Sequence, residues 1–226
     1  MELRLNKFLA EKVGLSRREA DNFIAEGKVL VNGKPAILGA RISEKDEIIL
    51  DGKKVENSKQ KYTYLMLNKP EGYVSSRKAQ GDAPTLYELL PEEYKKLKTV
   101  GRLDKNSSGL ILLTDDGDFA FKHTHPKFYK IKTYLITLNC ALEPLHQQEI
   151  SDFGIQLDDG PSKLFLTRLN DARTEWQVEM SEGRNRQIRR TFSALGYEVK
   201  KLHRIEFGEY KLEKLKPGEF KLVDKK

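Results

Sequence analysis

Asp104 is the residue of this sequence whose surroundings best suit covalent or acid–base chemistry. It lies in the segment GRLDKNSSG, between a turn at Gly101 and a loop of Ser107, Ser108 and Gly109, and an apolar run follows. A carboxylate presented on such a loop can act as a nucleophile or as a general base. An Asp near Gly and Ser more often caps a turn, so this segment alone leaves both interpretations open.

An arginine-rich segment far along the chain could supply a cation for Asp104. Within RNRQIRR there are four arginines: Arg184, Arg186, Arg189 and Arg190. The guanidinium group binds carboxylates and phosphates through paired hydrogen bonds. Since a partly buried carboxylate needs a cationic partner to stay ionised, we expect Arg184 or Arg189 to pair with Asp104. The alternative is a solvated helix face, although such a face more often carries lysine interleaved with glutamate.

The composition indicates a folded protein with a basic surface. The chain has 226 residues, of which 38% are hydrophobic and 33% charged, so it is too apolar for a disordered chain. Lysine and arginine number 41 against 34 acidic residues, which gives a net charge of +7, and most of the excess lies in residues 181–226. This distribution favours a polyanionic partner, although solubility alone could also account for it.

Nothing in the sequence suggests a membrane segment or redox chemistry. No apolar run approaches the roughly 18 to 20 residues that a membrane helix needs, and the N-terminal residues carry charges where a signal peptide is apolar. We therefore expect a cytoplasmic protein with no membrane partner. The single cysteine, Cys140, excludes an internal disulfide and a cysteine metal cluster, and we expect it to be a buried thiol.

Two short polar clusters could hold a metal, and we expect that neither does. Asp115, Asp116 and Asp118 resemble the start of a calcium loop but lack the closing acidic ligand, so we assign them to a turn and a helix cap. His123 and His125 have no third nitrogen or sulfur ligand nearby, so a zinc site is not expected. We interpret them as surface or RNA-facing histidines.

The N-terminal residues predict a small unit of two helices and two strands. Two helices within residues 2–24 are separated by a break at Gly14, and the segment SRRE forms a capping box at the start of the second. Arg17 and Arg18 fall in that helix's first turn, where cations oppose the helix dipole. A bound phosphate would relieve this conflict, and two ordinary surface arginines are the equal alternative. Strands follow within 28–36 and 47–55, the first ending at an Asn-Gly turn.

The remainder of the chain predicts a separate α+β domain. Residues 53–61 are polar and aperiodic, so we place a linker there, a boundary near residue 60, and domains at 1–60 and 61–226. Strands and helices interleave without a βαβ rhythm, which favours a mostly antiparallel sheet. We expect strands within 62–70, 109–114, 132–138, 162–169 and 175–180, and helices within 85–90, 118–123, 143–150 and 185–195.

Taken together, these motifs resemble those of bacterial ribosomal RNA pseudouridine synthases, in the branch that includes the enzyme acting on 16S rRNA. The resemblance covers nearly the whole chain. It is carried by RLNKFLA, SRREAD and VLVNG in the N-terminal part, and by LNKPEGYVSS, GRLDKNSSGLILLTDDG, KTYLITL, EGRNRQIRR and LGYEVKKLHRIEFG in the remainder. It implies a small S4-like RNA-binding domain followed by a catalytic domain with a cleft across an antiparallel sheet.

The resemblance implies a role for individual residues. Asp104 matches the catalytic aspartate of the family's GRLD block. Tyr134, which by itself could be an ordinary strand aromatic or a stacking platform, matches the tyrosine that packs against the target base. Arg189 matches the arginine that pairs with the catalytic carboxylate, and Arg102 the residue that fills the gap left by the displaced base. Further RNA contacts are implied for four arginines: Arg17, Arg18, Arg184 and Arg186. Thr191 departs from the family pattern, in which an apolar residue is expected.

The implied reaction suits these residue types. Conversion of uridine to pseudouridine breaks the N1 glycosidic bond, turns the uracil, and joins C5 to the same sugar carbon, with no net gain of atoms or electrons. No cofactor or metal is therefore expected. Asp104 could attack the sugar carbon or remove a ribose proton, and the sequence leaves both routes open. The target nucleotide has to leave its stack, which costs a few kcal/mol, and an arginine in the gap would offset this cost.

The substrate and the alternatives follow from the same comparison. We expect a monomer acting on ribosomal RNA, with 16S rRNA favoured over 23S rRNA because the chain is short and the segment FGIQLDDG resembles the 16S-directed branch. A non-catalytic RNA-binding factor for ribosome assembly is the second hypothesis, and the intact GRLD, KTY and QIR blocks argue against it. A nucleoside or sugar hydrolase is the third. It would require a second carboxylate opposite Asp104, for which the sequence offers no candidate.

Overall fold

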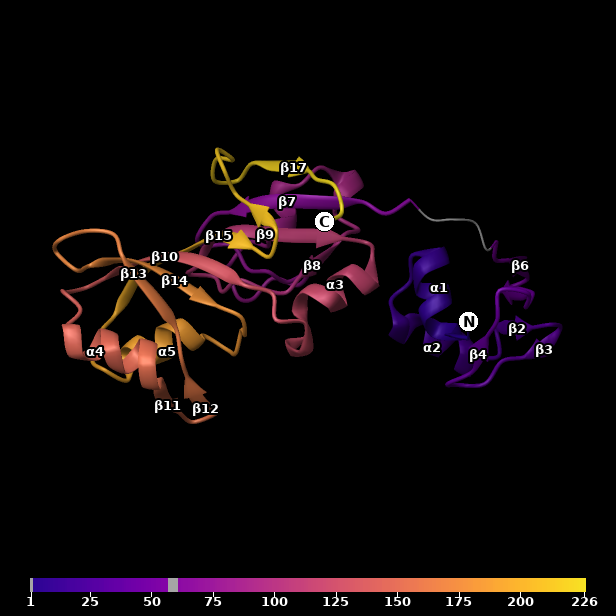
Figure 1. The fold of residues 1–226 in the computed structure, drawn as a ribbon. Coiled ribbons are helices and arrows are strands. Elements are labelled where there is room, and N and C mark those ends of the chain that lie inside the picture. The colour runs from indigo at the N-terminus through magenta and orange to yellow at the C-terminus, as the bar shows by residue number, and fades with distance from the viewer. Residues whose placement is uncertain (1, 57–60) are drawn as a thin grey trace. The chain divides into compact units, whose positions relative to one another are not determined.

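The structure is a computed structural model, and it describes residues 2–56 and 61–226. The chain divides into two compact units, Met1–Tyr62 and Thr63–Lys226 (Figure 1). The predicted boundary near residue 60 lies outside the described residues. The first residues of the predicted linker belong to a strand instead. Lys53–Lys54 form strand β6, which pairs with the preceding strand.

Two helices form one side of the N-terminal unit, as the sequence predicts. Helix α1 spans Leu5–Val13 and ends at Gly14, whose φ of 78° suits glycine. Helix α2 spans Arg17–Ala25 and begins with the predicted capping box, in which Ser16 Oγ accepts from the backbone N–H of Glu19 and the Glu19 carboxylate accepts from that of Ser16. The helices bury five residues in a shared core: Leu5, Phe8, Leu9, Ala20 and Ile24.

Short strands complete the N-terminal unit. Strand β1 (Leu3–Arg4) pairs with β4 (Arg41–Ile42), and a second sheet has the order β3 (Lys34–Pro35), β2 (Val29–Val31), β5 (Ile48–Leu50) and β6. The two residues between β2 and β3, Asn32 and Gly33, both have positive φ values, which is typical of a tight hairpin turn. The predicted strands and Asn-Gly turn are therefore confirmed.

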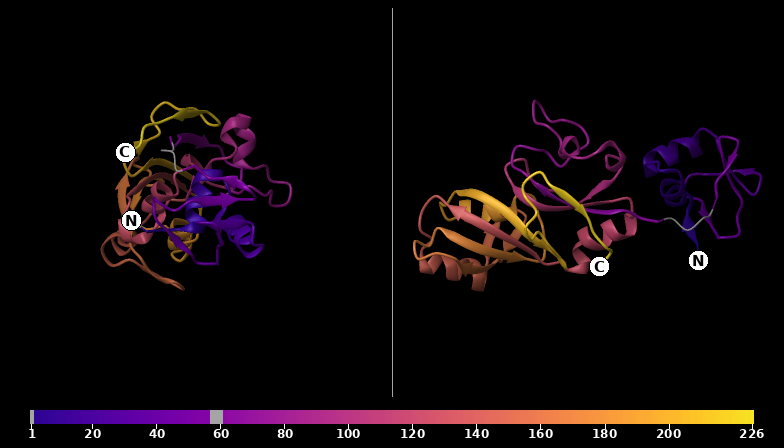
Figure 2. Two further views of the ribbon diagram at one scale, coloured as in Figure 1. Left: turned by 90° about the vertical axis from the view of Figure 1, so that its right-hand side faces the viewer. Right: turned by 90° about the horizontal axis from the view of Figure 1, so that it is seen from above.

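A single sheet of nine strands organises the second unit. Its main path is β13 (Phe165–Arg168), β14 (Glu175–Met180), β10 (Lys132–Leu138), β15 (Val199–Phe207), β9 (Ser108–Thr114), β7 (Tyr64–Lys69) and β17 (Phe220–Leu222). Strand β16 (Tyr210–Lys211) pairs with β15, and β8 (Lys98–Val100) pairs with β9. Figures 1 and 2 show β10, β15, β9 and β7 side by side. Every pairing is antiparallel except that of β15 with β9, which confirms the predicted α+β class among the described residues.

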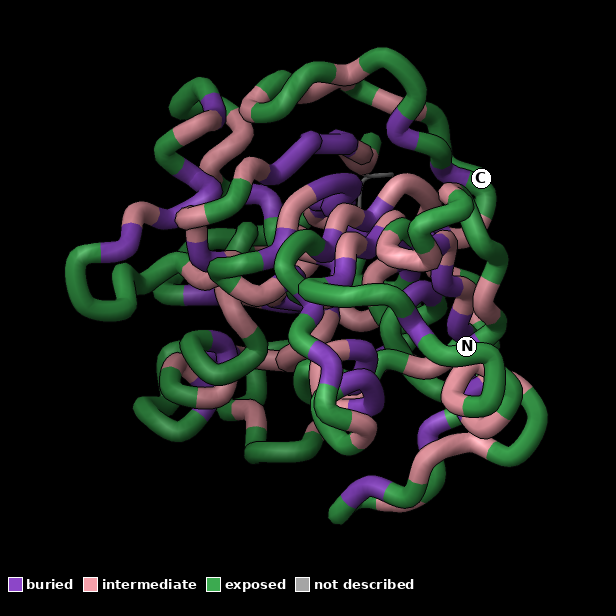
Figure 3. The backbone as a smooth tube through the Cα atoms, turned by 90° about the vertical axis from the view of Figure 1, so that its left-hand side faces the viewer, coloured by how far each residue is buried: buried purple, intermediate pink, exposed green. Residues whose placement is uncertain are grey.

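The sheet is buried on both faces, which explains its continuous apolar strands. In β9, Ile111 and Leu113 belong to one core, whereas Leu110 and Leu112 belong to another. Side chains alternate between the faces of a strand, so an uninterrupted apolar run suits a strand covered on both sides. Figure 3 shows buried stretches of the backbone that alternate with exposed segments.

The helices of this unit lie where the sequence predicts them, with different bounds. Helix α3 spans Gly117–Thr124 and α5 spans Gln187–Ser193. The predicted helix within 143–150 is α4 (Pro144–Gln148), continued by the π-helical turn η4 (Glu149–Phe153), and the one within 85–90 is the 3-10 turn η1 (Leu86–Leu89). Further 3-10 turns are η2 (Glu92–Tyr94) and η3 (Pro126–Phe128), and a hairpin is formed by β11 (Ile155–Leu157) and β12 (Gly160–Ser162).

The single cysteine is not buried. Cys140 is exposed, in the turn that follows β10, so the expectation of a buried thiol was wrong. Cys140 lies beyond Leu138, the last residue of β10, and so outside the sheet that buries the strand's apolar side chains. Across the described part of the chain, no helix has the length and apolar character needed to cross a membrane.

Candidate active site

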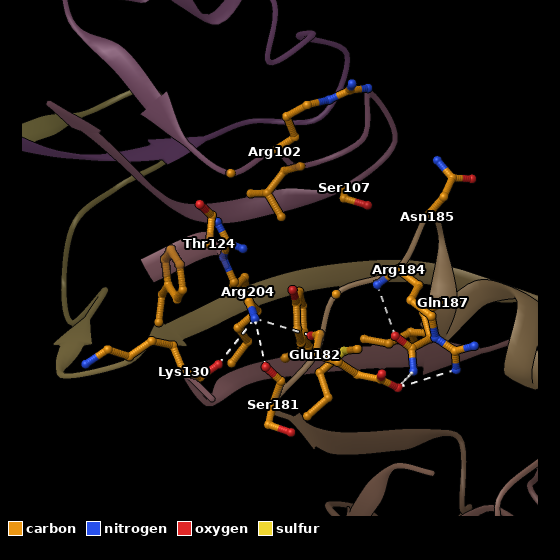
Figure 4. Close-up of a pocket in the computed structure, with 18 of the residues that line it drawn as sticks. Arg102, Ser107, Thr124, Lys130, Ser181, Glu182, Arg184, Asn185, Gln187 and Arg204 are labelled. Carbon is orange, nitrogen blue, oxygen red and sulfur yellow. Dashed lines mark hydrogen bonds and ion pairs between the residues drawn. The ribbon is translucent and has the colours of Figure 1, made fainter. Parts of the chain in front are cut away.

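A cavity of about 630 Å³ opens beside the central strands of the second unit (Figure 4). Its lining comes from the loop after β8, the end of α3, strands β10 and β15, and the turn between β14 and α5. The cavity contains Asp104, Tyr134 and Arg186, together with apolar side chains. The apolar side chains include Leu103, Met180, Ile188 and Leu202. Segments that are remote in sequence thus place a carboxylate, a phenol and a guanidinium in the same cavity, beside apolar side chains.

The loop that carries Asp104 is held by hydrogen bonds to the segment of residues 72–75 and by one hydrogen bond within the loop itself. Ser75 Oγ donates to the carbonyl of Leu103 at 2.8 Å and accepts from its N–H at 3.2 Å. The N–H of Gly72 donates to the carbonyl of Lys105 at 2.9 Å, and that of Ser107 donates to the carbonyl of Asp104 at 3.1 Å. With its backbone tied on both sides, the Asp104 carboxylate is presented in a defined position.

Asp104 forms its ion pair with Arg186, not with the arginines that the sequence suggested. Arg186 Nη1 lies 3.6 Å from Asp104 Oδ2, and the Asp104 side chain is 30% exposed. Arg186 precedes α5 in a left-handed backbone conformation with φ of 46°, which reorients its side chain relative to a helical residue. The expectation that Arg184 or Arg189 makes this pair was therefore wrong, because both have other partners.

Arg189 instead fastens α5 to the backbone on either side of it. Its Nη2 donates to the carbonyl of Asn106 at 2.5 Å, and its Nη1 donates to the carbonyl of Val199. Asn106 belongs to the Asp104 loop, and Val199 is the first residue of β15. Burial lowers the pKa of Arg189, the charge of Arg186 lowers it further, and that of Asp104 opposes the shift. Arg189 thus lies in the electrostatic field of Asp104 while it holds the loop through a carbonyl.

Arg184 forms its hydrogen bonds with the β11–β12 hairpin. Its guanidinium donates to the carbonyls of Asp159, Gly160 and Pro161 at 3.0, 3.0 and 2.8 Å, and to Asp159 Oδ1 at 2.7 Å. Arg190 also pairs with Asp159, at 2.6 Å between Nη2 and Oδ2. These contacts fix the segment from the hairpin to α5, beside the cavity.

Tyr134 lies on β10, two residues after Lys132, so both side chains are on the same face of the strand. Tyr134 is 8% exposed, and its neighbours across the sheet are Val178 of β14 and Arg204 of β15. A nearly buried phenol among Ile188 and Leu202 offers a flat, largely apolar surface with one polar end.

Lys69, which the sequence analysis did not single out as a site residue, is fully buried next to the Asp104 loop. Its Nζ donates to the carbonyls of Pro70 and Tyr73 at 2.9 and 2.8 Å. Burial lowers the pKa of Lys69 to about 8, while the charges of Glu71 and Asp104 oppose this effect. The signal in the sequence was a lysine at the apolar end of a strand, directly before the Pro70 turn.

Two further cations lie in the wall of the cavity. Lys132 Nζ donates to the carbonyls of Lys130, Ser181 and Glu182 at 3.2 to 3.3 Å, so it ties β10 to the turn that leads to Arg186 (Figure 4). Burial lowers the pKa of Lys132 to about 8, and the charge of Arg204 lowers it further. Arg204 is 2% exposed and donates from Nε to the carbonyl of Leu110 at 2.7 Å.

Thr191 is accommodated by a buried polar network. Its Oγ1 donates to the carbonyl of Gln187 at 2.9 Å and lies 2.7 Å from Ser162 Oγ, which also accepts from the Gln187 amide at 3.0 Å. The hydroxyl in place of the expected apolar side chain therefore joins α5 to β12.

The remaining sequence assignments have mixed outcomes. Asp116 caps α3, accepting from the N–H groups of Asp118 and Phe119, which confirms the assignment of a turn and cap. His123 is buried against Phe119, with ring centroids 3.9 Å apart, so it is not a surface histidine. It contributes to the cavity lining, and its interpretation as an RNA-facing histidine stays a prediction. Its ring also lies near the rings of Phe207 and Tyr210, and burial lowers the pKa of His123. His125 is exposed.

The arginines predicted to contact RNA are at the surface or at the cavity. Arg17 and Arg18 are exposed in the first turn of α2. Arg102 is exposed beside the Asp104 loop and contributes to the cavity lining, as do Arg184 and Arg186. Within residues 2–56 and 61–226, no group of three or more His, Cys, Asp or Glu side chains could hold a metal ion.

Comparison with known proteins gives two family matches. Residues 63–194 match the model for RNA pseudouridylate synthases, and residues 3–48 match that of the S4 domain. The chain is 40% identical to ribosomal small subunit pseudouridine synthase A of Pasteurella multocida, over 97% of this chain and 95% of that protein. It is 36% identical to ribosomal large subunit pseudouridine synthase B of Bacillus subtilis, over 96% and 90% of the two chains.

A solved structure agrees with these matches. The crystal structure of a pseudouridylate synthase superposes with a TM-score of 0.70 at 36% identity, covering 98% of this chain and 96% of that one. The catalytic-family match contains the Asp104 loop, Tyr134 and the arginines of the turn before α5. The chain therefore belongs to the RNA pseudouridylate synthase family and carries an S4 domain at its N-terminal end.

Proposed function

We propose that this protein isomerises a uridine of bacterial ribosomal RNA to pseudouridine with Asp104 as the catalytic carboxylate. The observation that carries the proposal is the ion pair of Asp104 with Arg186 at the mouth of an apolar cavity that also contains Tyr134. A carboxylate that shares its cavity with apolar side chains such as Leu103 and Ile188 and is paired with a guanidinium suits a group that has to approach a sugar carbon in its anionic form.

The chemistry that we assign to Asp104 balances without a cofactor. The bond between C1′ and N1 breaks, the detached uracil turns, and C1′ bonds to C5. The proton lost from C5 is matched by the proton that N1 carries in the product. The carboxylate can act on C1′ or on a ribose proton, and in either case it has to be ionised and within contact distance of the sugar.

The other cavity residues receive complementary roles in this proposal. Tyr134 supports the uracil ring through its flat, nearly buried phenol. Arg189 positions the catalytic loop through the carbonyl of Asn106. Arg102, exposed beside that loop, enters the gap that the flipped nucleotide leaves. Arg17, Arg18, Arg184 and Arg186 contribute positive charge toward the RNA backbone.

The RNA substrate is assigned by similarity to the relatives. Both the small-subunit and the large-subunit enzymes named above match nearly the full length of this chain, and the small-subunit relative is the more similar. We propose 16S rRNA as the substrate and a monomer acting in the bacterial cytoplasm, with 23S rRNA as the alternative. Chemical mapping of pseudouridine in both ribosomal RNAs of a deletion strain would decide between them.

The substitution Asp104→Asn tests the catalytic assignment. It keeps the size of the side chain and removes the charge, so pseudouridine formation should fall below detection while binding of unmodified rRNA remains within a few fold of wild type. The matched control is Asp171→Asn, because Asp171 is a fully exposed carboxylate paired only with the neighbouring Arg168. Pseudouridine formation by Asp104→Asn would show that another group carries the reaction.

A further inference from the structure

An exposed group of aromatic and lysine side chains borders the catalytic cavity. It occupies the end of α3, η3 and the approach to β10, in the sequence FAFKHTHPKFYKIK of residues 119–132. We call it the aromatic rim and define it by seven residues: Phe121, Lys122, His125, Lys127, Phe128, Tyr129 and Lys130. The rim carries positive charge only, because residues 119–132 include four lysines and no aspartate or glutamate.

Three aromatic rings of the rim form one cluster at the surface, those of Phe121, His125 and Phe128. Phe121 is 47% exposed, and its ring centroid lies 4.7 Å from that of His125 and 5.8 Å from that of Phe128. Lys127 Nζ lies 5.5 Å and 4.8 Å from the ring centroids of Phe121 and Phe128. Solvent-exposed aromatic side chains with a lysine ammonium close to their rings are typical of a binding surface rather than of a hydrophobic core.

Tyr129 shows a second unusual feature. Its side chain is 74% exposed, and its backbone is left-handed, with φ of 43° and ψ of 55°. A bulky residue in this region is a backbone outlier, for which Asn, Asp and Gly are better suited. An exposed tyrosine gains no burial energy that would offset this strain, so its presence here is better explained by a function of the ring.

The rim continues directly into the cavity. His125 and Lys130 contribute to the cavity lining, while Phe121 and Phe128 contact His125 from outside (Figure 4 shows Lys130 at the cavity). A polymer whose one unit occupies the cavity would therefore place its next units on the rim. The positive charge of the rim matches a polyanion, and its rings match unpaired bases, because every base presents a flat face for stacking.

We propose that the aromatic rim binds the unpaired nucleotides next to the target uridine, with Phe121 and Tyr129 as stacking platforms and Lys127 and Lys130 as phosphate contacts. This inference rests on the proposed function of the cavity. It adds a preference for a target within single-stranded RNA, because bases of a continuous duplex are stacked on each other and cannot stack on these rings.

The test measures binding of a fluorescent 12-nucleotide oligouridylate to the full-length protein by anisotropy. Phe121→Ala and Tyr129→Asn should each raise the Kd about fivefold or more, as expected for loss of one stacked base. Asparagine tolerates the left-handed backbone of residue 129, so Tyr129→Asn should keep its thermal stability and unfolding cannot account for weaker binding. Phe165→Ala is the matched control, since Phe165 is 65% exposed on β13 and outside the cavity lining.

The outcomes separate this proposal from the proposed function. Binding of the oligouridylate within twofold of wild type for both variants would overturn the rim assignment and would indicate that the rings serve another partner, such as a protein. An equal loss of binding for a 12-base-pair RNA duplex, or for Phe165→Ala, would also overturn it. None of these measurements requires catalysis, so failure of wild-type protein to form pseudouridine would count against the proposed function alone.

Discussion

Gly109 and Arg204 lie so close across the parallel strands β9 and β15 that no other residue fits at position 109. A Cβ on Gly109 would stand 2.2 Å from the carbonyl oxygen of Arg204 and 2.5 Å from its nitrogen, and the φ of Gly109 is 107°. This contact joins the strand that follows the Asp104 loop to the strand that carries Leu202 and Arg204. The cavity depends on it, because β15 lines the cavity and β9 directly follows the loop that carries Asp104.

Gly109→Ala should therefore destabilise the protein by about 2 to 4 kcal/mol, from overpacking against backbone and from backbone strain. Its residual pseudouridine formation should be reduced even at temperatures where it remains folded, because separation of β9 from β15 displaces Asp104. Urea unfolding and an activity assay at low temperature would measure the two effects.

Gly117→Ala provides the control for this substitution. Gly117 is the first residue of α3, has no positive φ, and has open space where a Cβ would stand. Its replacement should change stability by less than about 1 kcal/mol. A Gly109→Ala protein as stable and as active as Gly117→Ala would show that the strand contact can relax.

Substitution of Arg189 and of Arg186, the two arginines beside Asp104, should affect different measurements. The first should mainly lower stability and kcat, and the second should mainly weaken RNA binding. Arg189→Ala removes two hydrogen bonds from a charged donor to the carbonyls of Asn106 and Val199. We expect it to destabilise the protein by about 1 to 3 kcal/mol and to lower kcat at least tenfold, with Kd for RNA within about threefold. Arg186→Gln removes a half-exposed ion pair and should lower kcat only about three- to tenfold while it weakens RNA binding.

Measurement of kcat and Kd separately, with unfolding free energies for both variants, checks this division. An Arg189→Ala protein that loses affinity and keeps its turnover would indicate that Arg189 contacts phosphate rather than positioning the catalytic loop.

Much of the fold follows from local signals in the sequence. The capping box, the Asn-Gly turn and the bounds of β10 and β14 are as predicted, because each depends on residues close together in the chain. The sequence analysis missed β15, the nine-residue strand at the centre of the sheet. Its sequence VKKLHRIEF contains charged residues that lie at the protein surface or, like Arg204, are buried by partners remote in sequence. Register shifts against β10 also interrupt simple alternation.

The site was predictable in its residue types but not in its contacts. Asp104 and Tyr134 line the same cavity, as the resemblance to pseudouridine synthases implies. The counter-ion of Asp104 is Arg186 because of a left-handed backbone at the start of α5, which spacing within RNRQIRR does not reveal. Lys69 could not be ranked above other lysines, since its importance comes from complete burial.

Lys69 should make stability depend on pH in the alkaline range. Burial lowers its pKa from 10.5 to about 8 in the folded protein, so between these values the unfolded chain binds more protons than the folded one. Stability therefore rises with pH through this window as the cost of the buried charge is removed. The full shift corresponds to about 3 kcal/mol, and Lys132, with a pKa also lowered to about 8, acts in the same direction.

The difference in unfolding free energy between wild type and Lys69→Met isolates this contribution. The exposed Lys28, Lys54 and Lys211, whose pKa values are raised by carboxylate partners, are common to both proteins and cancel in the difference. Urea titrations at intervals from pH 7 to pH 10.5 should show wild type gaining relative to Lys69→Met above about pH 8. A constant difference would mean that the carbonyls of Pro70 and Tyr73, with the charge of Asp104, hold the ammonium in its charged form despite complete burial.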